Sequence, residues 1–360
     1  MKSIRTGRRI FFSVQVLGVD LSDLVSKRRV HLEDLSGKSI AVDAYNAMYQ
    51  FLAIIRGVSG EPLMDRERRV TSHLSGILYR STNLAEKGIR LVYVFDGAPP
   101  ALKEAELKRR MKVKDEALVK YEEARKRGAL DEARKYAQMT ARLKDTMVDD
   151  AKRLLVLMGV PWVQAPSEGE AQAAHLATRG DVWVAGSQDY DSLLFGAPRL
   201  VRNLAVTGRR KLPRKDVYVE VEPEIVELNL VLSELGLNRE QLVDLGILVG
   251  TDFNPRGIKG VGPKTALNLI KEHGRIENVL RAVKGGELPE NLDVIREIFL
   301  NPKVSDNFVI EWKRPDIDGV VSFLCGERAF SEVRVRNALE KMMIGVESGK
   351  GKKTLDAFFG

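Results

Sequence analysis

The chain has 360 residues, with 58 Lys and Arg against 50 Asp and Glu, and its formal net charge is +8. The length permits a large core and by itself suggests two domains, and the positive charge is typical either of a nucleic-acid partner or of a merely basic soluble protein. The single cysteine, Cys325, excludes a disulfide framework, and no apolar run is long enough to span a membrane.

The first 17 residues form an extension that is basic and then apolar, like the start of a secretory signal. Its apolar part is only about eight residues long, and no small-residue cleavage site follows it. We therefore predict that this segment is neither a signal peptide nor a membrane anchor.

Strands and helices alternate from about residue 37 to 100. The apolar run KSIAVDAYN precedes an amphipathic helical pattern, RVTSHLSGILYRSTNLAEKG, and a second apolar run, RLVYVFDG, follows. Asp43 and Asp96 stand at the ends of the two apolar runs. Open α/β sheets keep their sites at the carboxyl ends of their strands, so we expect both carboxylates at that edge.

Residues 103–144 carry most of the excess charge, with 14 Lys and Arg against 8 Asp and Glu. Strong helix formers in two stretches, broken at Gly128, predict a helical hairpin. One interpretation is a solvated hairpin with charge pairs four residues apart. We favour a basic helical arch that handles nucleic acid, because the segment begins seven residues after Asp96 and so emerges beside the acidic edge.

Strands and helices alternate again from residue 146 to 252, and this pattern predicts a mostly parallel sheet. Glu168 and Glu170 follow one apolar run, although Ser167 and Glu170 also fit a helix-capping box. Asp189 and Asp191 end another run, VWVAGSQDYDSLLF, where a spacing of two places both on one side of a strand. The last acid of this kind is Asp252, in LGILVGTDFNP.

A glycine-rich turn with Gly260 and Gly262 runs into a helix that starts at Pro263. Its amides could hold a phosphate with Lys264 adding charge, and we favour this over a purely structural turn. A helical pattern covers about residues 310–346, and the final residues 347–360 read as a flexible basic tail that ends in TLDAFFG. Leu355, Phe358 and Phe359 have no core to enter, so we interpret them as anchors for a partner rather than as a tail that folds back.

Seven carboxylates at strand ends are costly unless cations neutralise them, and hard oxygen ligands select Mg²⁺, with Mn²⁺ as the alternative. Two such ions would let the site hydrolyse a phosphodiester bond. Lys103 and Arg110, on one helix face, could offset phosphate charge in the transition state. Tyr49 could stack on an unpaired base, or it could be a core residue. The acids are Asp43, Asp96, Glu168, Glu170, Asp189, Asp191 and Asp252.

From Gly18 onward the chain resembles the flap structure-specific endonucleases, archaeal and eukaryotic members of the xeroderma pigmentosum G-like 5′ nuclease superfamily. The motifs that carry the resemblance are GVDLSDL, VDAYNAMYQFL, YVFDGAPPALK, APSEGEAQAA, GSQDYDSLLFG and GTDFNPRGIKGVGPKTAL. It implies that the seven acids are the metal site, that Lys103 and Arg110 are the basic pair of the helical gateway, and that Tyr49 stacks near the scissile nucleotide. It also implies a helix-two-turn-helix at about residues 243–274, around a bound K⁺.

The resemblance implies an α/β fold with a mostly parallel central sheet covered by helices on both faces (PIN-like). The expected regions are an N-terminal nuclease region at 18–115, the helical arch at 103–144, an internal nuclease region at 146–270, and a C-terminal helical part of the same globule at 275–346. The tail resembles a box that binds the sliding clamp (PCNA) through Leu355, Phe358 and Phe359, with Lys352 in place of the usual glutamine.

Family members begin Met-Gly-Val-Asp, and here Leu17 stands in the place of that Met. We favour the hypothesis that Leu17 is the initiator and that residues 1–16 are an annotation artefact or an appendage. The rival interpretation is a targeting or DNA-binding arm that uses Arg5, Arg8 and Arg9.

The predicted function is a 5′ flap endonuclease with 5′–3′ exonuclease activity in DNA replication and repair. It would act as a monomer on branched DNA, away from membranes, in the archaeal cytoplasm at the nucleoid, or in a eukaryotic nucleus. The alternatives are a related 5′–3′ exonuclease or junction resolvase, and a non-enzymatic DNA-binding clamp accessory.

Overall fold

A computed structural model describes residues 18–57, 60–204, 208–211, 218–282 and 289–356. At its centre is a seven-stranded mixed sheet in the order β1-β9-β6-β5-β2-β3-β4. The strands from β6 to β4 are mutually parallel, and β9 pairs antiparallel with both β6 and β1. The bounds are β1 Arg28–Arg29, β2 Ser39–Asp43, β3 Arg90–Phe95, β4 Trp162–Gln164, β5 Val184–Gly186, β6 Arg199–Arg202 and β9 Glu224–Glu227.

Apolar side chains of the central strands alternate between two cores, as the period of two in a strand requires. In β2, Ile40 packs into one core and Ala41 into the other; in β3, Tyr93 and Val94 divide in the same way. Each face is therefore buried under helices, which is why these strands read as nearly continuous apolar runs. The predicted fold class, a mostly parallel sheet with helices on both faces, is confirmed.

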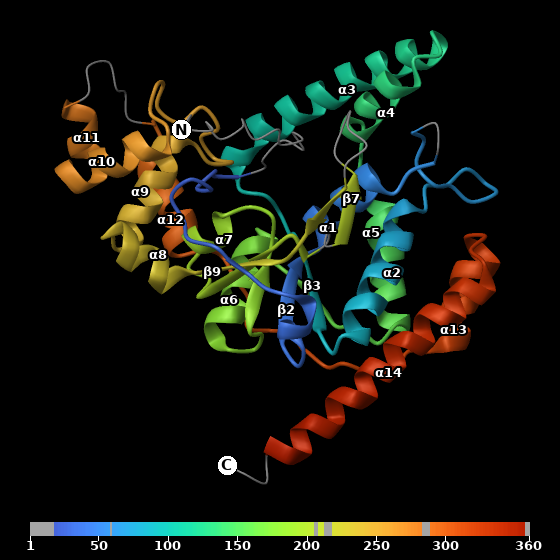
Figure 1. The fold of residues 1–360 in the computed structure, drawn as a ribbon. Helices are drawn as coiled ribbons and strands as arrows, with labels where there is room; N and C mark the ends of the chain where they lie inside the picture. Colours follow the sequence, from blue (N-terminus) through green and yellow to red (C-terminus); the bar gives the residue numbers. More distant parts are fainter. Residues whose placement is uncertain (1–17, 58–59, 205–207, 212–217, 283–288, 357–360) are drawn as a thin grey trace, which may run out of the picture.

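The helices on the two faces differ in their place along the chain (Figure 1). On one face lie α1 Ala44–Ile54, α2 Ser72–Glu86, α5 Asp145–Leu157, α13 Ile317–Val321 and α14 Glu332–Asp356. The other core is covered by α6 Gly169–Arg179, α7 Asp191–Leu194, α8 Leu228–Leu235, α9 Arg239–Val249, α10 Pro263–His273, α11 Ile276–Ala282 and α12 Leu292–Leu300. Among the residues that the structure describes, no helix is long and apolar enough to cross a membrane.

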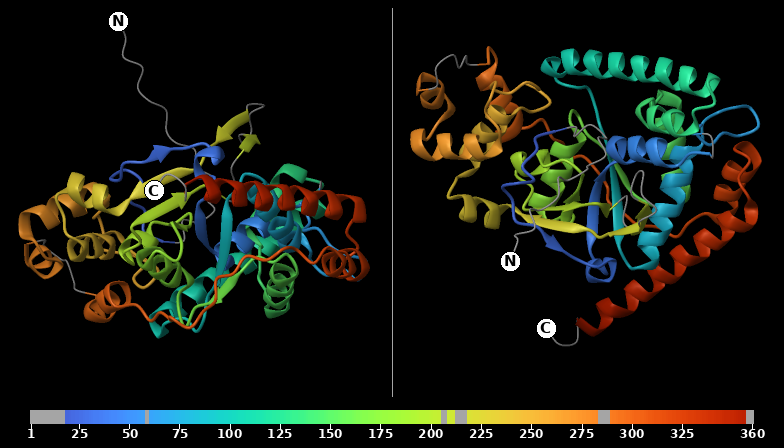
Figure 2. Two further views of the ribbon diagram at one scale, coloured as in Figure 1. Left: turned by 90° about the horizontal axis from the view of Figure 1, so that it is seen from below. Right: turned by 45° about the horizontal axis from the view of Figure 1, so that its top comes forward.

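Two structures project on the side where the parallel strands end. One is an arm made of α3, Glu104–Lys126, and α4, Leu130–Met139, which pack on one another after a break at Gly128 (φ +70°), as the sequence predicts. The other is the group that contains α10 and α11. Figure 2 shows the arm and this group at opposite ends of that side.

The apolar run before Asp252, predicted to be a strand like the others, belongs to helix α9, which starts at a capping box formed by Asn238 and Gln241. Three other local predictions are corrected. A hairpin of β7, Gly208–Lys211, and β8, Tyr218–Val221, lies in a stretch for which no strand was predicted. The predicted helix from 310 begins only at Ile317, because the preceding segment bonds to the turn after α5: Lys313 N donates to Gly159 O and Asp316 N to Leu157 O.

The third correction concerns the predicted flexible tail. Helix α14 continues through Asp356, so residues 347–356 are helical. Once a helix is nucleated, each added residue forms a further backbone hydrogen bond, which offsets the unfavourable glycines Gly349 and Gly351. Leu355 lies in this helix, whereas Phe358 and Phe359 lie outside the described residues, as does the extension 1–17.

Candidate active site

Asp43 and Asp96 lie at neighbouring strand ends, as predicted. Asp43 is the last residue of β2, and its Oδ1 accepts a hydrogen bond from Asn46 N at 2.9 Å, which caps α1. Asp96 directly follows β3, and its Oδ1 accepts from Gly169 N at 2.6 Å. The start of α6 is thereby tied to the end of β3.

The α6 start holds Glu168 and Glu170, but the predicted capping box is absent. The N-cap residue is Glu168, and Ser167 Oγ instead donates to Ala98 O at 3.1 Å. The Glu170 side chain accepts a hydrogen bond from Ser187 Oγ across the site. The side chains of both glutamates therefore make no cap hydrogen bond, and they contact Lys103 and Ser187 in the site instead.

Asp189 and Asp191 are both buried in the site, although not for the predicted reason. Strand β5 ends at Gly186, so the pair lies in a turn and at the first residue of α7 rather than on one side of a strand. Asp191 Oδ1 accepts from Val19 N at 2.7 Å, which brings the first described residues of the chain to the acids. A hydrogen bond across 172 positions carries no local sequence signal.

Lys103 and Arg110, at the foot of the arm, reach the same acids. Lys103 Nζ lies 2.5 Å from Glu168 Oε2 and 3.2 Å from Asp252 Oδ2, and Arg110 also pairs with Asp252. Glu106, a buried acid that the sequence did not single out, holds Arg110 Nε at 2.8 Å. The predicted grouping of the basic pair with the acids is thus seen in the geometry.

Several site carboxyls have raised pKa values, because they are buried close to one another with few positive charges to offset them. Burial, together with neighbouring carboxylates, raises the pKa of Asp43 to about 6 and the pKa of Asp96 to about 8. The same causes raise the pKa values of Glu170 and Asp191 well above their usual range. Burial alone would lower the pKa of Lys103, but its pairing with Glu168 and Asp252 raises it.

The donor set suits a divalent cation. All seven predicted acids contribute oxygen only, and two cationic side chains face them, so the cluster stays strongly negative when it ionises. Within the described part of the chain, no group of three such side chains is close enough to hold one ion. Lys103 and Arg110 instead occupy the carboxylates of Glu168 and Asp252.

The predicted DNA contacts lie around this cluster. The half-buried Tyr49, on α1, has Lys114 Nζ of the arm 4.1 Å from its ring centroid. The glycine turn follows Asp252 closely: Gly260 adopts φ +83°, Gly262 is the N-cap of α10, and Lys264 is exposed. Tyr49 therefore lies against the arm, and Lys264 lies on the surface at the start of α10.

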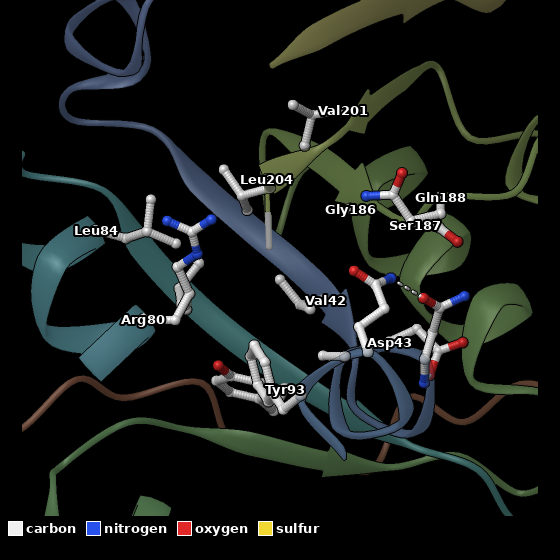
Figure 3. A pocket seen from close by; sticks show the side chains of 15 residues that line it. Val42, Asp43, Arg80, Leu84, Tyr93, Gly186, Ser187, Gln188, Val201 and Leu204 are labelled. Atoms are coloured by element: carbon white, nitrogen blue, oxygen red, sulfur yellow. Dashed lines mark hydrogen bonds between the residues drawn. The ribbon is translucent and has the colours of Figure 1, made fainter. Parts of the chain in front are cut away.

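Two polar side chains that contact the acids or support such a contact, Asn46 and Gln50, were not predicted as site residues. Asn46 Nδ2 donates to Asp189 Oδ2 at 3.0 Å, and Gln50 Nε2 donates to Asn46 Oδ1. Gln50 also lines a small cavity of about 30 Å³ next to Asp43, together with Arg80 (Figure 3). The positions of Asn46 and Gln50, three and seven residues after Asp43 on one helix face, are the only signal that could have found them.

The class of protein follows from the fold, because a mixed sheet with helices on both faces and carboxylates gathered at its parallel strand ends is typical of the PIN-like nucleases. The XPG N-terminal domain family matches residues 12–117, and the XPG I-region family matches residues 159–252. These domains, together with the curated relatives that follow, show that the chain belongs to the flap endonuclease family.

Curated relatives support this assignment along nearly the whole chain. Flap endonuclease 1 of Ignicoccus hospitalis is 58% identical over 335 residues, which are 92% of this chain and 95% of the relative. Flap endonuclease 1 of Pyrococcus abyssi is 51% identical over 343 residues, 95% of this chain and 98% of the relative.

Solved structures agree. Flap endonuclease-1 from Methanococcus jannaschii is 42% identical, with a TM-score of 0.72, and the match covers 92% of this chain and 99% of that one. The catalytic core of Rad2 in complex with a DNA substrate is 25% identical, with a TM-score of 0.66, over 88% and 96% of the two chains.

Proposed function

We propose that this protein is a structure-specific 5′ flap endonuclease, with 5′–3′ exonuclease activity, that processes branched DNA in replication and repair. The observation that carries the proposal is the cluster of seven carboxylates at the foot of a basic arm. Membership of the flap endonuclease family makes the chain a DNA nuclease, and hence a hydrolase.

Two Mg²⁺ ions, or Mn²⁺ in their place, would supply the electrostatic stabilisation and the activated water for phosphodiester hydrolysis. Asp43, Asp96, Glu168, Glu170, Asp189, Asp191 and Asp252 would hold them. Lys103 and Arg110 would then exchange their carboxylate partners for the scissile phosphate, since both are paired with acids in the structure.

The surrounding elements would bind the rest of the substrate. The 103–144 arch would receive the single-stranded 5′ end, with Tyr49 stacking on a base close to the cut. The turn at Gly260 and Gly262, with Lys264 and a bound K⁺, would grip the backbone of duplex DNA. The basic excess of the arch supports this division, because phosphate contacts dominate DNA affinity.

We also propose that the C-terminal residues Leu355, Phe358 and Phe359 bind the sliding clamp (PCNA), and that the enzyme works as a monomer in the compartment that holds the chromosome. The two adjacent phenylalanines near the chain end are the feature that supports a clamp contact.

The decisive experiment maps the products on four radiolabelled substrates: a double flap, a nick, a recessed 5′ end and a four-way junction. We expect fast cleavage at the flap base with Mg²⁺ and none with EDTA. Symmetric cuts in the junction at a higher rate than flap cleavage would favour a junction resolvase. Unchanged function after substitution of the acids would favour a non-enzymatic clamp accessory.

A further inference from the structure

Asn46 contacts two of the strand-end acids at once. Its backbone N–H donates to Asp43 Oδ1 at 2.9 Å, and its side-chain Nδ2 donates to Asp189 Oδ2 at 3.0 Å. One residue in the first turn of α1 therefore fixes a carboxylate from β2 and another from the turn after β5, which are adjacent strands of the sheet.

The direction of the hydrogen bonds is set by the acid. An ionised carboxylate only accepts, so the Asn46 amide must turn its NH₂ group to Asp189 and its oxygen away. That oxygen accepts a hydrogen bond from Gln50 Nε2. Gln50 Oε1 is then the last acceptor in this series of hydrogen bonds. Each amide orientation follows from the one before it.

The last acceptor in this series of hydrogen bonds has no donor among the described residues. Gln50 Oε1 is buried and has no hydrogen-bond partner among the described residues, although Gln50 lines the cavity that Arg80 also lines (Figure 3). A rotated Gln50 amide would place its oxygen against the oxygen of Asn46, which is repulsive. A buried acceptor without a partner costs free energy, so its persistence indicates that the contact with Asn46 is the stronger constraint.

We propose that Asn46 and Gln50 are positioning residues that hold Asp189, and through the helix cap Asp43, in the arrangement that binds a divalent cation. The inference rests on the proposed metal-dependent function. Neither residue touches the metal or the substrate; Asn46 acts through the carboxylates, and Gln50 acts through Asn46. Such groups behind a ligand commonly change metal affinity ten- to a hundredfold when they are removed.

The test measures Mn²⁺ binding to the full-length protein without DNA, by the electron paramagnetic resonance signal of free Mn²⁺. Asn46→Ala keeps the backbone bond to Asp43 but removes the side-chain bond to Asp189 and the bond that Asn46 accepts from Gln50. We therefore expect binding to weaken about ten- to a hundredfold. Gln50→Met removes the orienting donor, and we expect a loss of about fivefold. In the Asn46→Ala background, Gln50→Met should change nothing further.

Two controls keep the outcomes separate. Asn278→Ala removes an exposed amide that donates to His273 O at 3.0 Å, and should leave Mn²⁺ affinity unchanged. If Asp189→Asn binds Mn²⁺ as tightly as the parent, the metal site itself is wrong. If Asp189→Asn fails to bind but Asn46→Ala binds within twofold of the parent, the positioning role is wrong. Equal losses from Gln50→Met in both backgrounds would show that Gln50 does not act through Asn46.

Discussion

Replacing Gly18 by alanine tests whether Asp191 must stay where the structure places it. A methyl group on Gly18 would lie 2.7 Å from Asp191 Oδ1 and 2.8 Å from its Cγ, closer than the 3.0 Å below which real Cβ contacts essentially never occur. Asp191 is only 4% exposed, and its Oδ1 accepts from Val19 N at 2.7 Å. The carboxylate can therefore yield only by breaking that hydrogen bond.

The magnitude follows from that bond. A hydrogen bond to a charged group contributes about 1.5–3 kcal/mol, and inserting a methyl group into a filled site costs a similar amount. If the displaced carboxylate loses that much interaction in the transition state, cleavage slows roughly ten- to a hundredfold, since each 1.4 kcal/mol is a factor of about ten.

The assay is single-turnover cleavage of a 5′ flap DNA with enzyme in excess and saturating Mg²⁺, beside DNA binding in EDTA. We expect Gly18→Ala to bind DNA normally and cut slowly. Gly326→Ala is the matched control, because a methyl group there meets open space. Cleavage by Gly18→Ala within twofold of the parent would refute the reasoning, because Asp191 would then tolerate displacement.

Three further predictions concern the acids and the DNA grip. Asp189→Ala should retain less than about a tenth of the flap cleavage rate, a loss of at least ~1.4 kcal/mol, while its DNA affinity in EDTA stays within about twofold; faster cleavage would remove Asp189 from the metal set. With pKa values of about 6 for Asp43 and about 8 for Asp96, the native state binds more protons than the unfolded state from about pH 4 to 8. The free energy of unfolding in EDTA, measured by denaturant titration, should therefore fall as the pH rises through this window and fall less with Mg²⁺; a rise would contradict the raised pKa values. Lys264→Ala should reduce the slope of log K against log salt by about 0.9, measured by fluorescence anisotropy, whereas Lys313→Ala should not; an unchanged slope would mean that Lys264 does not contact phosphate.

Much of the candidate site could be predicted because most of its acids follow apolar strands; Asp252 is the exception, since the run before it is helix α9. The runs that end at Asp43 and Asp96 form β2 and β3, which pair in parallel with Asp43 opposite Val94. In a parallel sheet all strands end at one edge, so carboxylates at their ends meet without any knowledge of the strand order. The basic composition of 103–144 likewise placed cationic side chains next to the acids.

Other features depended on local competition that a sequence pattern does not resolve. Ser167 fits a capping box, yet its hydroxyl bonds to Ala98 O, and Glu170 reaches Ser187 instead. The segment before α13 has helical periodicity, yet it is not helical because the turn after α5 offers backbone partners to Lys313 and Asp316. In both cases a tertiary hydrogen bond outcompetes a local preference of about the same size.

The fold class, the acid cluster and the position of the basic arm follow from local sequence patterns, because strand periodicity and charge are properties of short segments. Only the tertiary structure decided that Lys103 pairs with Glu168, that Val19 holds Asp191, and that Asn46 holds Asp189. These contacts join residues 65, 172 and 143 positions apart. Their partners are chosen by where the folded sheet brings the side chains, and a hydrogen bond or ion pair a few ångströms long exists only once that packing is complete.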